Sequence, residues 1–166
     1  QGTGARRRAE RLIQAAHGGN RADLPLERRS QMAKLKLEPP KPVEVCVIGI
    51  SCHESAHRLC WSLNKALGLE LARRSDVVDD DGPRSCYSAF EHVVEADGFR
   101  WLLLNNHSGS GILIRSQRTI DYFLVMDPEL FESHPDVLER VKAADFVLTA
   151  YDLPFKQLRN GHKLLL

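Results

Sequence analysis

The chain has 166 residues, of which 43% are hydrophobic and 27% charged, and its formal net charge is +1. This length suits one domain, and at this size a compact core forms without disulfides or metals. A net charge so close to zero excludes a polyanion binder that acts through bulk charge. The four cysteines form no C-x-x-C pair and are interpreted as buried, reduced thiols, which are typical of a reducing compartment.

No stretch of the sequence approaches the roughly 20 apolar residues of a membrane span. The N-terminus has charge but no apolar signal segment. We therefore expect a cytoplasmic protein without contact to a membrane, and nothing in the sequence predicts a cofactor.

Residues 1–42 are predicted to lie outside the globular fold. The segment GTGARRRAE opens a basic helix, which Gly18 and Gly19 end. The prolines in 39–42 fix an extended backbone and predict a linker before the first strand.

Residues 1–31 resemble the last helix of a double-stranded RNA-binding domain of the kind found at the C-terminus of ribonuclease III. About one helix of such a domain is present, so the RNA surface is incomplete, and an amphipathic or disordered basic tail is the alternative. The first methionine, Met32, precedes small and basic residues that are typical of a natural start. Residues 1–31 are therefore interpreted as upstream sequence, a cloning remnant or part of a larger reading frame.

The rest of the chain, 43–166, is predicted to be one α+β domain with the order β-α-β-β-β-β-α-β. The hairpin predicted around Asp97 and Gly98 and the wide separation of the two helices indicate a mainly antiparallel sheet of about five or six strands with both helices on one face. Gly68 is expected to cap the first helix, Ser133 to start the second, and 76–83 to be a solvated loop. The predicted strands are 43–51, 69–73, 86–95, 99–105, 119–126 and 146–153, and the first helix is 54–67.

The stretch IRSQRTIDYFL resembles the signature of the bacterial IPExxxVDY family. Ile114, Asp121 and Tyr122 match the motif, whereas Arg115 and Ser116 stand where the family has Pro and Glu. Further blocks in the same order extend the resemblance over the globular part of the chain. The resemblance implies a small bacterial cytoplasmic protein of unknown function, without catalytic residues that could be carried over.

One stretch, HESAH, carries a pattern of metal chemistry. On a helix, two histidines four residues apart share a face and can bind zinc, with the glutamate as general base. This gives a zinc-dependent hydrolase as the alternative function, with His53 and His57 as ligands and Glu54 as base. His53 is expected before the regular helix, and a third ligand would have to come from His92 or His107. A pair of partly exposed histidines is the other interpretation.

The connection 105–121 is the longest one between two apolar strands. Long irregular connections in compact domains are usually functional or disordered. We therefore predict a non-catalytic binding or adaptor module, with either a protein or RNA as a partner whose identity the sequence leaves open. A solvated loop that covers the sheet is the alternative, in which the Asp121 carboxylate bonds loop amides and Tyr122 is packed. The predicted binding residues are Asn105, Asn106, His107, Arg115, Arg118, Asp121 and Tyr122.

Overall fold

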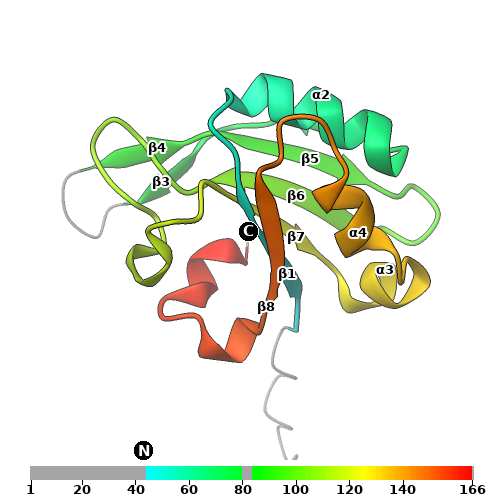
Figure 1. Ribbon diagram of the computed structural model, residues 1–166. Coiled ribbons are helices and arrows are strands. Elements are labelled where there is room, and N and C mark those ends of the chain that lie inside the picture. The colour runs from blue at the N-terminus through cyan, green and yellow to red at the C-terminus, as the bar shows by residue number, and fades with distance from the viewer. Residues whose placement is uncertain (1–43, 80–83, 166) are drawn as a thin grey trace, which may run out of the picture. The chain divides into compact units, whose positions relative to one another are not determined.

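The computed structural model describes residues 44–79 and 84–165 (Figure 1). The predicted basic helix and linker in 1–42 lie outside the described residues. Within the described part, no helix is both long and apolar enough to cross a membrane.

A six-stranded sheet forms the centre of the domain, and every pair of neighbouring strands in it is antiparallel. Its strands, in spatial order, are β2 (Ala72–Arg73), β5 (Ala89–Val93), β6 (Arg100–Asn105), β7 (Tyr122–Met126), β1 (Cys46–Ser51) and β8 (Thr149–Leu153). A separate hairpin pairs β3 (Val77–Asp79) with β4 (Ser85–Tyr87). The predicted α+β class with a mainly antiparallel sheet is confirmed.

The helices α2 (Ala56–Leu67), α3 (Pro128–Ser133) and α4 (Val137–Lys142) cover one face of the sheet (Figure 1). Leu59 and Leu63 of α2 are fully buried, as their helical spacing requires. Gly68 ends α2 in the left-handed conformation with a φ of 73°, and its N–H donates to the Asn64 carbonyl at 2.9 Å. The predicted glycine cap and the single helical face are both confirmed.

The second predicted helix is present as α4, but it begins at Val137 and not at Ser133, and the short helix α3, which the sequence did not predict, precedes it. Ser133 ends α3, and its Oγ donates to the Leu130 carbonyl at 3.1 Å, so the predicted cap at Ser133 is wrong. The break comes from Pro135, which disfavours helical backbone at His134, where φ is −125° and ψ is 68°.

The opposite face of the sheet is covered by the connection 105–121 and by the C-terminal residues 154–165 (Figure 1). Leu113, Ile114 and Ile120 of the connection are at most 1% exposed. The connection covers the sheet, as the alternative interpretation expected, but its apolar side chains belong to the core and are not solvated. This segment also contains the 3-10 turn η2 (Arg115–Gln117), and the C-terminal residues contain η3 (Phe155–Gln157) and η4 (Gly161–Leu164).

Several strands are shorter than the sequence predicts, and two regions differ more. β3 occupies part of the predicted loop 76–83, and the predicted strand 86–95 is divided between β4 and β5 at Ser88. β7 begins at Tyr122 and not at Thr119. Ile120 consequently packs on the face opposite to the one that holds Tyr122, because it precedes the regular alternation of the strand.

Candidate functional site

Asn106 organises the connection 105–121 from its inside. The side chain is 0% exposed. Its Nδ2 donates to the carbonyls of Gln117 and Ile120, both at 2.8 Å, and its Oδ1 accepts from the Ile114 N–H at 2.8 Å. One buried amide thus holds the two ends of the connection together, and it has no surface left for a partner.

Asp121 and Tyr122 tie the start of β7 to the loop between β1 and α2. Asp121 Oδ2 accepts a hydrogen bond from the Cys52 N–H at 2.9 Å, and the Tyr122 hydroxyl donates to the Glu54 carbonyl at 2.7 Å. The prediction that the carboxylate bonds a loop amide is confirmed, although the amide belongs to a different loop from the one that ends at Asp121. Both side chains therefore fix the architecture.

Asn105 and His107 also direct their polar atoms toward the protein. Asn105 Oδ1 accepts from the His107 N–H at 2.9 Å. His107 Nε2 lies 3.0 Å from the Ile120 carbonyl and 3.9 Å from Asp121 Oδ1. These contacts join the start of the connection to its end, so the polar groups of Asn105 and His107 stabilise its fold.

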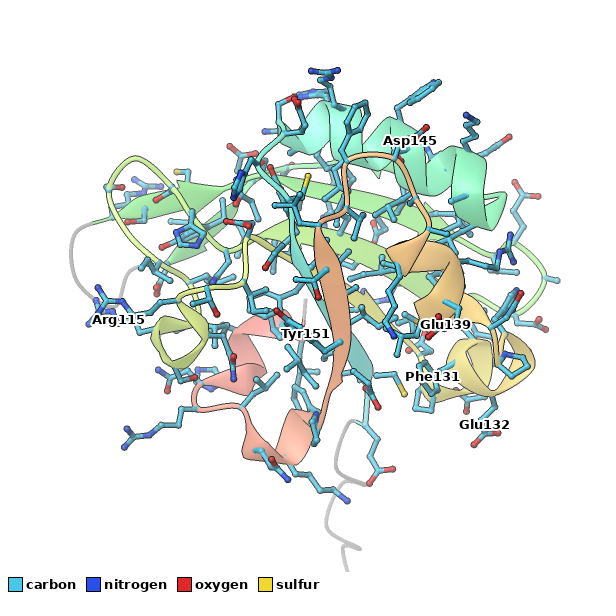
Figure 2. All side chains as sticks on the ribbon, in the orientation of Figure 1. Arg115, Phe131, Glu132, Glu139, Asp145 and Tyr151 are labelled. Atoms are coloured by element: carbon cyan, nitrogen blue, oxygen red, sulfur yellow. The ribbon has the colours of Figure 1, made fainter. Side chains whose placement is uncertain are left out.

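Arg115 and Arg118 are the two predicted binding residues that stay on the surface. Both are exposed, Arg115 in the turn η2 and Arg118 directly after it. Figure 2 shows Arg115 pointing away from the sheet, on a different side of the domain from α2. Of the seven predicted residues, the structure engages five in internal hydrogen bonds and leaves the side chains of Arg115 and Arg118 exposed.

The stretch HESAH lacks the helical geometry on which the zinc hypothesis depends. Because α2 begins at Ala56, His53 and Glu54 precede the helix, and His53 does not share a helical face with His57. The His57 ring contacts the Phe90 ring edge to face with the ring centroids 5.1 Å apart, and Glu54 Oε2 accepts from Arg58 at 2.7 Å. In 44–79 and 84–165, no three His, Cys, Asp or Glu side chains are grouped so that they could hold a metal ion.

The buried thiols are poor candidates for nucleophiles. Burial raises the pKa of Cys52, and the neighbouring Asp121 carboxylate raises it further. Burial also raises the pKa of Cys60. Since the thiolate is the reactive species, both groups are held in their less reactive form at neutral pH.

An exposed aromatic surface on α2 was missed by the sequence analysis. Trp61 is 58% exposed, and Lys65 Nζ lies 5.4 Å from the centre of its ring. A hollow of about 300 Å³ beside it is lined by His57, Arg58, Trp61 and Phe146. We call these four residues and Lys65 the Trp61 surface. The signal in the sequence was the position of Trp61, which is out of phase with the buried residues of the helix.

Phe146 enters this surface from a backbone conformation that a bulky residue rarely adopts. Its φ is 71°, in the left-handed region. The Arg58 guanidinium lies 4.5 Å from the centre of the Phe146 ring, and Ser62 Oγ donates to the Asp145 carbonyl at 2.7 Å. Surrounding contacts thus hold a strained residue in place, a pattern that is common at functional sites.

No family model, no curated protein and no solved structure matches this chain. The resemblance to the IPExxxVDY family therefore stays a prediction. The same holds for the resemblance of residues 1–31, which lie outside the described part.

We predict that Asn106→Ala lowers the free energy of unfolding by about 3 kcal/mol, because it removes three buried hydrogen bonds of about 1 kcal/mol each and leaves the Ile114 N–H without its side-chain acceptor. Urea denaturation of the variant measures this loss. Asn105→Ala is the matched control and removes one half-exposed hydrogen bond, so its cost is about 1 kcal/mol. Equal costs for the two variants would contradict the central role of Asn106.

A second prediction concerns alkaline pH. Burial, and after it the charges of Cys52, Asp121 and Glu54, raise the pKa of Tyr122 from 10 to about 12. The folded protein therefore keeps this proton where the unfolded chain releases it, and stability falls as pH rises from 10 through 12. Between about pH 9 and pH 11, the unmodified protein should lose about 1 kcal/mol more than Tyr122→Phe. Parallel losses in urea titrations of the two proteins would show that Tyr122 does not carry the effect.

A third prediction isolates the backbone strain at Phe146. Phe146→Gly and Phe146→Ala both remove the ring, but glycine tolerates a positive φ, so the glycine variant should be more stable by about 1 kcal/mol. The same pair of substitutions at Val147, which has no positive φ, should give the opposite order. Thermal unfolding of the four variants measures both differences, and the same order at both positions would refute the strain.

Proposed function

We propose that this chain is a non-catalytic binding module, an adaptor whose partner docks on the Trp61 surface. The observation that carries the proposal is the 58% exposure of Trp61 beside a hollow formed by a second aromatic ring. Tryptophan and arginine dominate the residues that contribute most to binding energy at interfaces. A large exposed aromatic side chain on a helix that already buries its core face is typical of such a site.

The charges around Trp61 favour a protein partner over RNA. Arg58 pairs with Glu54 at 2.7 Å, and Lys65 pairs with Asp145 at 3.4 Å. Figure 2 shows Asp145 beside α2. Two cations and two carboxylates leave no excess of positive charge, whereas binding to a nucleic acid depends on cations that neutralise phosphates. An apolar centre with a charged but balanced rim suits a protein interface.

The surface around Arg115 and Arg118 stays the second candidate for the contact with the partner. Both side chains are exposed, and both belong to a turn that the buried amide of Asn106 holds in place. It offers no exposed aromatic anchor, so we rank it below the Trp61 surface as a source of binding energy.

Membership of the IPExxxVDY family and a cytoplasmic location belong to the same proposal. The free state of all four cysteines suits a reducing compartment. The zinc-dependent hydrolase receives no support from the position of His53 before α2, and we do not propose it as the function.

The test compares Trp61→Ala with Arg115→Ala/Arg118→Ala at equal folded yield. Each protein is immobilised, incubated with nuclease-treated cell extract, and any retained partner is purified and titrated. We expect Trp61→Ala to weaken binding at least 30-fold, which corresponds to about 2 kcal/mol, and the arginine variant to bind normally. Normal binding by Trp61→Ala would reject the Trp61 surface, and loss of the partner on nuclease treatment would reject a protein partner.

Fluorescence quenching gives a direct second measurement. The chain has two tryptophans, and Trp101 is only 1% exposed, so acrylamide quenching reports almost entirely on Trp61. Docking of the partner should protect the emission from the quencher. Unchanged quenching in the saturated complex would place the contact elsewhere.

A further inference from the structure

A groove lies at the end of the sheet where α2 ends, at the turn between β5 and β6 and beside α3 (Figure 1). It consists of two hollows of about 470 Å³ each, and His92 and Val94 line both of them. We call it the hairpin groove.

The floor of the hollow beside α3 is apolar. Trp101 and Leu130 are buried beneath it, at 1% and 6% exposure. Val93 is 45% exposed and lines the second hollow. The other apolar residues that line the hollow beside α3 are Leu67, Leu69, Val94 and Phe99.

The rim of the groove is acidic on both sides. Its carboxylates come from Glu70, Glu91, Glu95, Asp97 and Glu129, and neither hollow has a lysine or an arginine among its described lining residues. Glu91 is engaged, because its Oε1 lies 3.1 Å from Arg74 Nη1 and 3.8 Å from Arg100 Nη1. The C-terminal end of α2 borders the groove as well, and the dipole of a helix favours positive charge there.

We propose that the hairpin groove docks a basic protein segment in which lysine or arginine side chains alternate with apolar ones. The apolar floor takes the apolar side chains, and the carboxylates of Glu70, Glu95, Asp97 and Glu129 face the cations. A nucleic acid is repelled by this rim, and a small polyamine has cations but no side chains to fill the floor. The charge complementarity thus selects a basic peptide as the occupant.

The probe is a capped peptide of alternating lysine and leucine, titrated into the full chain by calorimetry. The triple variant Glu70→Gln, Glu95→Gln, Asp97→Asn should bind it at least 10-fold more weakly. The matched control is Glu132→Gln, Asp136→Asn, Glu139→Gln, which removes the same charge outside the groove and should change the affinity less than twofold. Figure 2 shows Glu132 and Glu139 on α3 and α4. An equal loss of affinity in both triple variants would show that only the net charge of the protein attracts the peptide, and this would overturn the proposal.

Two further ligands test the apolar part. A lysine–serine peptide and spermine carry the cations without the leucines, and both should bind at least 10-fold more weakly than the lysine–leucine peptide. Equal binding by either would overturn the proposal in favour of simple attraction of cations. Trp61→Ala should leave the affinity for the peptide unchanged, because Trp61 lies outside the groove. The outcome for the hairpin groove is therefore independent of the outcome for the Trp61 surface.

Discussion

The buried amide of Asn106 is the interaction on which the second face of the sheet depends. Its three hydrogen bonds, all at 2.8 Å, hold together a connection whose own backbone forms little regular structure. With the connection closed, Leu113 and Ile114 pack onto Leu104 and Phe123 of the sheet. Because a buried polar group without partners costs free energy, the buried amide favours the one conformation of the connection that supplies its partners.

The start of β7 links this layer to the helical layer on the other face. Asp121 and Tyr122 bond the loop that leads into α2, through the Cys52 N–H and the Glu54 carbonyl. The central strands are consequently buried on both sides, and most polar side chains near them are engaged in internal bonds. The exposed features that could contact a partner lie at the periphery, on the outer face of α2, at the end of the β5–β6 hairpin and around the turn η2.

These two peripheral surfaces differ in the charge that they present. The Trp61 surface has an aromatic centre with balanced ion pairs around it, whereas the hairpin groove has an apolar floor and a rim of carboxylates. Surfaces of such different chemistry select different partners. Two surfaces of different chemistry are what the proposed role as an adaptor requires.

The sequence by itself determined the class of fold and the position of most elements, because the period of the apolar residues follows directly from helix and strand geometry. Leu59 and Leu63 marked the buried face of α2, and Gly68 marked its end. Only the tertiary structure decided what the polar residues do. An asparagine in a long connection can either contact a ligand or hold the connection together, and its local sequence does not distinguish the two. Asn106 does the second, because folding brings carbonyls up to 14 residues away to its amide. Trp61 became a candidate because no other described element covers it, and the sequence of α2 alone does not show which residues other elements cover.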